Sequence, residues 1–426
     1  MLFNPGILRN YDIRGAYGKD FDDEFAFRLG AALVYYFKAN ELVVARDMRE
    51  SSAGLTQAVI RGITSTGCNV VDIWTASSPF FYYAVIHGSG SAGVMITASH
   101  MGPEFNGFKI CRKDAMTIGK ESGLLDIMKI IQAPDAPTPA PKLGIVAVRN
   151  LLNEHADFLV LHSQLKPGEV QVKVAIEAEP MIRRELDVIF QKLGIAAVQE
   201  NYDIKFGFDA DGDRLLVYNA HGLQIRGDLV TGVLAADLAQ HKHFLLHLGG
   251  GPKVVSDLRG SRGTHDYLVA QKIDLLPSRI GHTYIKQVMK EHQADFSGEA
   301  SGHMMFKVMN FSESTQLALL KLLKIMETEK KTIDELVQPM VTWAYSGEIN
   351  TPIEGWPDSV PAILLKVKDR YRDAEISELD GLKVDYRDWW FLLRASGTEP
   401  LIRLIVEAKT KSLMDEKIKE VQGLLW

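Results

Sequence analysis

The stretch VVARDMRESSAGLTQAVIRGITSTGCNVVDI, residues 43–73, decides the fold class that the sequence predicts. Its first residues, Val43 to Ala45, form a short apolar run that is typical of a buried strand. The pair Ser51-Ser52 can cap the helical pattern that follows, and Gly67 can end that helix. Asn69 to Ile73 is again typical of a strand. A helix between two strands predicts an α/β fold with a parallel sheet.

Similar alternation continues along the chain. The patterns predict further strands and helices at Lys173–Glu177, Met181–Leu193, Lys253–Ser256, Gln316–Met326, Val360–Tyr371 and Ser412–Leu425. The segment Ala133–Lys142 contains four prolines, which indicates a linker. A chain of 426 residues is too long for one hydrophobic core, so several domains are expected.

The composition is that of a soluble globular protein, with 46% hydrophobic and 24% charged residues. A formal net charge of −6 argues against a general nucleic-acid binder, which needs a basic surface. With only two cysteines, Cys68 and Cys111, we expect no disulfide framework, and both should be buried structural thiols in a reducing compartment. No charged-then-apolar leader opens the chain, and no apolar run approaches the ~18 residues of a membrane span. We therefore expect a cytoplasmic protein that does not enter the membrane.

A serine and a histidine follow a short apolar strand. Thr97-Ala98-Ser99-His100 comes directly after Gly93–Ile96, and glycine, proline and asparagine turn the chain at 102–107 before Lys109. A hydroxyl beside an imidazole and near an ammonium suits a phosphoryl acceptor or an acyl nucleophile. A Ser-His pair in a turn is also a common backbone cap, so this motif alone leaves both roles open.

Three aspartates at alternate positions, Asp209, Asp211 and Asp213, form the second motif. Such carboxylates can project together and repel one another, which makes a hard divalent cation their natural partner. An EF-hand calcium loop is excluded, since its sixth position requires glycine and is Arg214, while its twelfth requires glutamate and is Ala220. Both flanks, residues 204–208 and 215–218, look like strands. A magnesium site between strands is therefore favoured over a solvated acidic turn.

The third motif is Arg394-Ala395-Ser396-Gly397-Thr398-Glu399-Pro400, with Arg403 shortly after it. Glycine lets backbone N–H groups converge on an anion, and arginine forks match phosphate oxygens. A polar hairpin loop is the alternative, but hairpins rarely need so many donors. A phosphate cradle is favoured.

The fourth motif is Gly298-Glu299-Ala300-Ser301-Gly302-His303. If this segment is extended, Glu299, Ser301 and His303 lie on one side. That side would suit a polyhydroxylated ligand such as a sugar, although a polar strand edge explains the pattern equally well.

Together these motifs resemble those of the α-D-phosphohexomutase superfamily, which includes phosphomannomutases, phosphoglucomutases and phosphoglucosamine mutases. The order of the serine, metal, sugar and phosphate loops matches, and so do Tyr11-Asp12-Ile13-Arg14-Gly15 and Arg279-Ile280-Gly281-His282. The resemblance runs from Tyr11 to about Ala408, nearly the whole chain.

The resemblance implies a heart-shaped α/β protein with a central active-site cleft. Three Rossmann-like α/β/α domains with mixed sheets would precede a smaller α+β, TBP-like C-terminal domain. The expected boundaries are 1–143 for the serine-loop domain, 144–238 for the metal-loop domain, 239–344 for the sugar-loop domain and 345–426 for the phosphate-loop domain.

The resemblance also implies an enzyme that interconverts hexose 6-phosphate and hexose 1-phosphate. A phosphoryl group on Ser99 would pass to the sugar, with a hexose 1,6-bisphosphate as intermediate and activator. Mg²⁺ would be held by Asp209, Asp211, Asp213 and the Ser99 phosphate. Ser99 would be surrounded by further reacting groups, namely Arg14, His100, Lys109, His282 and His303. Substrate contacts would come from Arg214, Glu299, Ser301, His303, Arg394, Ser396, Gly397, Thr398 and Arg403.

Several alternatives stay open. Mannose phosphate is the expected substrate, glucose phosphate a second one, and a phosphoglucosamine mutase is the nearest rival. A regulatory relative that only binds sugar phosphates is the non-enzymatic alternative. Met101 stands where the family usually has asparagine, which raises the question of how the serine loop is pinned. We expect a monomer or homodimer whose partner is a small-molecule hexose phosphate.

Overall fold

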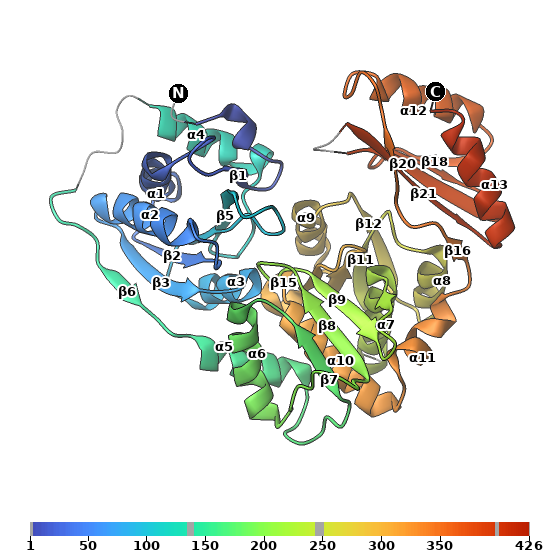
Figure 1. The fold of residues 1–426 in the computed structure, drawn as a ribbon, viewed down its shortest axis with the longest axis horizontal. Helices are drawn as coiled ribbons and strands as arrows, with labels where there is room; N and C mark the ends of the chain where they lie inside the picture. The colour runs from blue at the N-terminus through green and yellow to red at the C-terminus, as the bar shows by residue number, and fades with distance from the viewer. Residues whose placement is uncertain (1–2, 134–139, 243–250, 397–399, 426) are drawn as a thin grey trace. The chain divides into compact units, whose positions relative to one another are not determined.

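The computed structural model describes residues 3–133, 140–242, 251–396 and 400–425. The chain forms two compact units: residues 1–224 with 302–330, and residues 225–301 with 331–426. Figure 1 follows the chain from its N-terminus through both units.

The first unit begins with a mixed sheet of six strands. Across the sheet they are β1 (Ile13–Ala16), β5 (Phe105–Arg112), β4 (Ala92–Ile96), β2 (Glu41–Arg46), β3 (Asn69–Thr75) and β6 (Val146–Val148). The four strands β4, β2, β3 and β6 are parallel, as the sequence predicts, whereas β5 runs antiparallel to β1 and β4. The pairing of β6 with β3 carries this sheet past the predicted boundary after residue 143.

Helices α1 (Asp23–Phe37) and α2 (Ser52–Ser65) pack together over this sheet (Figure 1). Small residues allow their close approach. A Cβ on Gly30 would lie 2.2 Å from the carbonyl oxygen of Val59, and one on Gly62 would lie 1.9 Å from that of Phe27. The core below them contains apolar residues of both helices, of the sheet and of α4 (Leu124–Gln132).

A second sheet in this unit carries the acidic motif. Its strands β7 (Val174–Glu177) and β8 (Ile204–Phe208) are parallel, and β9 (Leu215–Asn219) is antiparallel to β8. The short β10 (Gln224–Ile225) lies where the chain passes between the units. The remaining elements of the first unit are α3 (Ser78–His87), α5 (Leu152–Ser163), α6 (Pro180–Leu193), α10 (Thr315–Glu329) and the antiparallel pair β14 (Met304–Phe306) and β15 (Ser312–Glu313).

The second unit contains a parallel sheet in the order β12 (Asp274–Ser278), β11 (Lys253–Asp257) and β13 (Phe296–Gly298). Its helices are α7 (Gly227–Lys242), α8 (Arg262–Ala270), α9 (His282–His292) and the short α11 (Ile333–Val337).

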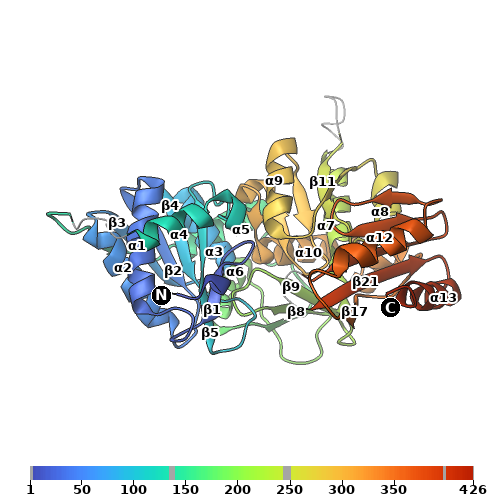
Figure 2. The same ribbon diagram turned by 90° about the horizontal axis from the view of Figure 1, so that it is seen from above.

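The C-terminal part of this unit is an antiparallel sheet. Its strands are β16 (Ala344–Tyr345), β17 (Ile349–Pro352), β18 (Glu375–Ser377), β19 (Leu382–Asp385), β20 (Trp389–Ala395) and β21 (Leu401–Ala408). Helices α12 (Val360–Arg370) and α13 (Lys411–Gln422) bury apolar residues against one face (Figures 1 and 2). Trp390, Leu392 and Ile405 on the other face pack against Leu258 and Ile280.

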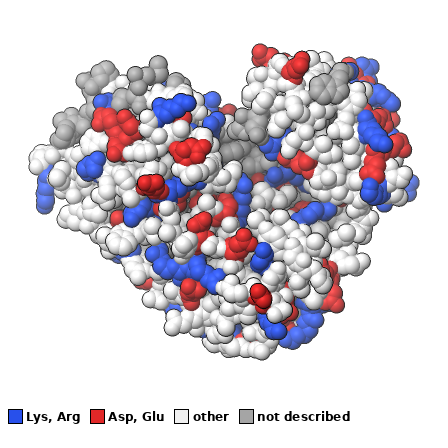
Figure 3. Space-filling model, in the orientation of Figure 1, with Lys and Arg blue, Asp and Glu red and all other residues white. Residues whose placement is uncertain are grey.

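The predicted helices and strands outside the sugar loop correspond to observed elements, with ends that differ by a few residues. Most of the predicted Ala133–Lys142 linker lies outside the described residues. Cys68 and Cys111 are buried free thiols, as expected. Among the helices of the described ranges, none combines the length and apolar character that a bilayer crossing needs. Lysine and arginine are interspersed with aspartate and glutamate on the face that Figure 3 shows.

A buried histidine lies between helices α5 and α3 of the first unit. His155 on α5 stacks on Phe80 of α3, with ring centroids 4.9 Å apart and an interplanar angle of 10°, and also contacts Tyr83 at 4.8 Å. Its Nε2 is buried without a hydrogen-bond partner among the described residues. Burial, with a smaller contribution from His87, lowers the pKa of His155 to about 3.

Stability is therefore expected to fall in mild acid. The folded state excludes the charged imidazole. Above the unfolded pKa of about 6.5, His155 therefore does not lower the free energy of unfolding. Between pH 6.5 and about 3 it lowers this free energy by about 1.4 kcal/mol per pH unit. In His155→Leu, the free energy of unfolding should fall less between pH 7 and pH 5 than in the wild type, by the equivalent of about one bound proton. Urea unfolding at the two pH values measures it. The exposed His221, changed to leucine, serves as control. An unchanged slope in His155→Leu would contradict the prediction.

Candidate active site

Ser99 lies in a tight loop directly after β4. Its backbone has a φ of 53°, in the left-handed region that serine rarely adopts, and its N–H donates to Thr97 Oγ1 at 2.9 Å. The Ser99 hydroxyl donates to Asp209 Oδ2 at 3.2 Å and lies 3.3 Å from His100 Nδ1. The hydroxyl thus points at the acidic motif, which comes from a different sheet.

Arg49 holds this loop in place. Its guanidinium donates to the carbonyl oxygens of Ser99 at 2.5 Å, Met101 at 2.7 Å and Gly102 at 2.7 Å, and forms an ion pair with Asp47 at 3.0 Å. Because these bonds reach the backbone, the side chain at Met101 is not what pins the loop. The sequence indicates a structural role for residues 46–52, and these contacts bear it out, but it does not give the partners of Arg49.

The three aspartates converge as predicted. They lie in the loop between β8 and β9, and one ligand atom from each lies within 4.8 Å of the others. Gly212 turns the loop with a φ of 73°. Asp211 Oδ1 is buried and has no hydrogen-bond partner among the described residues. A buried carboxylate oxygen without a partner, next to two further carboxylates, fits a hard divalent cation.

Lys109 on β5 lies among these carboxylates. Its Nζ is 2.5 Å from both Asp211 Oδ2 and Asp213 Oδ2. Burial opposes its charge, but Asp211 and Asp213 overcome this effect and raise its pKa. Burial likewise opposes ionisation of Asp213, but Lys109 and then His303 hold the pKa of Asp213 well below its usual range. Burial and repulsion from Asp213 and Asp211 raise the pKa of Asp209.

Three further predicted residues reach the same place. Arg14 Nε pairs with Asp12 at 2.7 Å and its Nη1 donates to the carbonyl of Ala98 at 3.2 Å, next to Ser99. His303 Nε2 lies 3.4 Å from Asp213 Oδ1, and Arg214 Nε lies 3.9 Å from Asp209 Oδ2. The first unit thus brings together Ser99, His100, Arg14, Lys109, Arg214, His303 and the three aspartates.

The predicted alternation of the sugar loop is wrong. Strand β13 ends at Gly298 and β14 begins at Met304, and the chain turns between them at Gly302, whose φ is 96°. A Cβ at Gly302 would lie 2.6 Å from the carbonyl oxygen of Leu215, so the turn requires glycine. As a result His303 meets the metal loop and does not share a strand face with Glu299 and Ser301.

Glu299 and Ser301 remain neighbours in the second unit. Ser301 Oγ lies 3.5 Å from Glu299 Oε2, while Glu299 Oε1 accepts from Arg259 at 3.3 Å and from the N–H of Gly281 at 3.2 Å. Arg259 is itself paired with Asp257. His282 begins α9, directly after Gly281. The glutamate is therefore held rigidly beside the start of the helix that carries His282.

The phosphate loop joins β20 to β21. Arg394 and Arg403 are direct cross-strand partners, so their side chains start from the same face of the sheet. Like charges opposite each other destabilise a sheet unless an anion lies between them. Arg403 pairs with Glu348 at 2.7 Å, and its Nη2 lies 3.4 Å from Ser396 Oγ. Gly397 and Thr398 lie outside the described residues.

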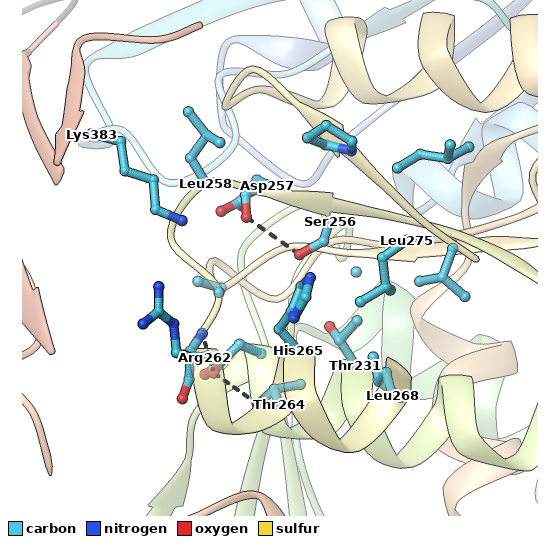
Figure 4. Close-up of a pocket in the computed structure, with 18 of the residues that line it drawn as sticks. Thr231, Ser256, Asp257, Leu258, Arg262, Thr264, His265, Leu268, Leu275 and Lys383 are labelled. Carbon is cyan, nitrogen blue, oxygen red and sulfur yellow. Dashed lines mark hydrogen bonds between the residues drawn. The ribbon is translucent and has the colours of Figure 1, made fainter. Parts of the chain in front are cut away.

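The second unit also contains a cavity of about 280 Å³ between β11, β12 and α8, bordered by β19 and β20 (Figure 4). Its aspartates are already neutralised by arginines: Asp228 pairs with Arg226, Asp257 with Arg259 and Asp385 with Arg262. It is lined by Gly298 and Ala300 but not by Glu299. Among the described residues, none of the site residues that the sequence predicts lines this cavity.

Three segments of the chain match one family of known proteins. Residues 6–137, 226–342 and 348–422 match the phosphoglucomutase/phosphomannomutase family, as alpha/beta/alpha domain I, alpha/beta/alpha domain III and C-terminal domain. A phosphomannomutase of Methanocaldococcus jannaschii is 30% identical over 98% of this chain and 97% of its own length. Phosphohexose mutases of Xanthomonas campestris pv. campestris are 29% identical over 98% of both chains. The crystal structure of a phosphoglucomutase/phosphomannomutase family protein from Burkholderia thailandensis superposes with a TM-score of 0.86 at 22% identity, covering 99% of this chain and 97% of that one.

Proposed function

The chain belongs to the phosphoglucomutase/phosphomannomutase family, and from this premise we propose that it interconverts hexose 6-phosphate and hexose 1-phosphate. Mannose phosphate is the proposed main substrate and glucose phosphate a second one, in line with relatives named phosphomannomutase. The observation that carries the proposal is the Ser99 hydroxyl, 3.2 Å from Asp209 in a cluster of three carboxylates and one buried ammonium.

In the proposed reaction Ser99 carries a phosphoryl group. The free O1 or O6 hydroxyl of a bound hexose phosphate attacks the phosphorus, a new P–O bond forms to the sugar, and the bond to Ser99 Oγ breaks. One of the titratable groups expected around Ser99 would take the proton of the sugar hydroxyl as the bond forms, and one would give a proton to Ser99 Oγ as it leaves, so that no net proton is gained or lost. The resulting hexose 1,6-bisphosphate reorients, and its other phosphate returns to Ser99 by the reverse steps.

Asp209, Asp211 and Asp213 would hold Mg²⁺, which stabilises the negative charge of the transferring group when bound. Lys109 and Arg14 add fixed positive charge close to the serine loop. Phosphoryl transfer depends chiefly on such positioning and electrostatics. Arg49 contributes by fixing the backbone that carries Ser99.

The phosphate that does not react would lie between Arg394 and Arg403, with Ser396, Gly397 and Thr398 as further donors. One cradle serves both half-reactions, because the bisphosphate presents a phosphate to it in either orientation. Glu299 would accept hydrogen bonds from sugar hydroxyls, and Ser301 would donate hydrogen bonds to them.

A coupled assay of mannose, glucose and glucosamine 1-phosphates, side by side, tests the substrate. We expect turnover of the mannose and glucose compounds in Mg²⁺. Preference for the glucosamine compound would assign the rival specificity. Intact-protein mass spectrometry tests the enzyme class: absence of a phosphoryl adduct on Ser99, even after incubation with a hexose 1,6-bisphosphate, would favour a binding protein instead.

Arg403→Ala is expected to weaken substrate binding. Losing one charge-assisted contact of about 1.5–3 kcal/mol should raise KM about 10–100-fold. Phosphorylation of Ser99, in the other unit, should persist in this variant. Steady-state kinetics and intact mass check the two parts, and Arg387→Ala, at an exposed arginine in the turn between β19 and β20, is the control. A wild-type KM in Arg403→Ala would contradict the cradle.

We infer a cytoplasmic location, which the two buried free thiols support.

A further inference from the structure

Glu185 is a fully buried carboxylate on α6 to which the proposed chemistry gives no role. Its Oε1 accepts from the N–H of Ser77 at 2.8 Å, and its Oε2 accepts from Ser77 Oγ at 2.6 Å and from Gln316 Nε2 at 2.8 Å. Gln316 Nε2 also donates to Ser77 Oγ at 3.1 Å. Burial raises the pKa of Glu185 to about 7, although these hydrogen bonds oppose the shift. One carboxylate thus joins the start of α3 to the start of α10.

The residues next to these two partners hold the acidic loop. Ser78 follows Ser77; its N–H donates to the carbonyl of Asp211 at 2.8 Å and its hydroxyl donates to Asp211 Oδ2 at 2.6 Å. Thr315 precedes Gln316, and its Oγ1 donates to the carbonyl of Gly212 at 2.6 Å. Ser78 and Thr315 therefore hold the loop from two sides. Glu185 connects the residues next to them, Ser77 and Gln316.

Packing leaves this loop little freedom to adjust. A Cβ on Gly212 would lie 2.9 Å from Ile182 Cδ1 and 3.1 Å from Ser77 Cβ. Ile182 lies one turn before Glu185 on α6. A shift of α6 or of Ser77 would consequently be passed to the loop, because closely packed atoms cannot absorb it locally.

We propose that Glu185 is a positioning residue for the metal loop: by fixing Ser77 and Gln316 it lets Ser78 and Thr315 set the orientation of Asp211 and Gly212. This inference rests on the proposed function, in which the three aspartates bind a divalent cation. Glu185 acts through other residues and touches neither the substrate nor the aspartates. Hydrogen-bonded groups that orient ligands in this way commonly change metal affinity 10–100-fold when removed.

The test is calorimetric titration of Mg²⁺ into the full-length protein and its Glu185→Gln variant. The amide has nearly the same shape but cannot accept all three hydrogen bonds, so the Mg²⁺ dissociation constant should rise about 10-fold. At saturating Mg²⁺ the KM for the hexose phosphate should stay that of the wild type, which a general loss of structure would not allow.

Glu327→Gln is the matched control. Glu327 on α10 is also a buried carboxylate that accepts from backbone N–H groups, those of Gln171 and Val172, but it has no contact with the metal loop. Its amide variant should keep the wild-type Mg²⁺ affinity even if it is less stable. A loss of affinity equal to that of Glu185→Gln would show an unspecific effect and overturn the proposal.

Ser78→Ala supplies an independent measurement that does not depend on the folding of Glu185→Gln. It should weaken Mg²⁺ binding, and in the double variant the two losses should not multiply fully, because Glu185 acts in part through Ser78. Full multiplication of the two effects would overturn the proposal, as would wild-type affinity in Glu185→Gln. If the unaltered protein binds no Mg²⁺ at all, the proposed metal site is wrong. If the unaltered protein and Glu185→Gln bind Mg²⁺ equally well, the metal site stands and only the role of Glu185 is wrong.

Discussion

Ser99→Ala is expected to lower turnover of hexose phosphate by about 10⁴-fold or more, because the variant has no oxygen to carry the phosphoryl group. The hydroxyl also donates to Asp209 and lies near His100, but Arg49 holds the backbone of the loop, so the fold should persist. Coupled kinetics measure the loss. Intact mass should show no phosphoryl adduct in the variant after incubation with a hexose 1,6-bisphosphate.

The control for this experiment is Ser89→Ala, at an exposed serine just beyond the end of α3; this variant should retain wild-type turnover and the phosphoryl adduct on Ser99. Near-normal turnover in Ser99→Ala would remove the basis of the proposed reaction. Substrate binding should survive in this variant, since the arginine cradle belongs to other strands. Loss of catalysis with retained binding therefore separates a phosphate carrier from a residue that only shapes the pocket.

Lys109→Met is expected to have the second large effect, on stability and activity together. Lys109 Nζ contacts Asp211 and Asp213 in a fully buried site, and its removal leaves two carboxylates without their cation. Breaking a buried ion pair from one side typically costs about 3–5 kcal/mol of unfolding free energy. Removing fixed charge beside the reacting group should lower kcat by about 10²–10³-fold as well.

Urea unfolding with and without Mg²⁺ checks this prediction. If the aspartates bind Mg²⁺, the added cation should restore part of the lost stability, since it neutralises the same carboxylates. Lys113→Met, an exposed lysine just beyond the end of the same strand, should change stability by less than about 1 kcal/mol. Equal stability of the Lys109 and Lys113 variants would show that the buried charges are compensated in another way.

Much of the active site could be predicted because each motif is local in sequence. Within ten residues, each motif indicates the chemistry it can perform: a hydroxyl after a strand, carboxylates at alternate positions, and arginines around a glycine. Sequence reasoning failed where an effect depends on a turn, as at Gly302, after which His303 meets the metal loop. It did not give the partners of Arg49 and Glu185, which lie about 50 and 108 residues away along the chain.

The sequence by itself determined the fold class, the order of the motifs and the chemistry that each can perform, because these depend on residue type and short-range periodicity. Tertiary structure alone decided that the serine of one sheet meets the aspartates of another. It also decided that Lys109 and Asp213 keep each other ionised. The same packing places Ser77, Glu185 and Gln316 where they support the acidic loop. These relations arise from packing between distant segments, where burial strengthens each polar contact and no local pattern records the partner.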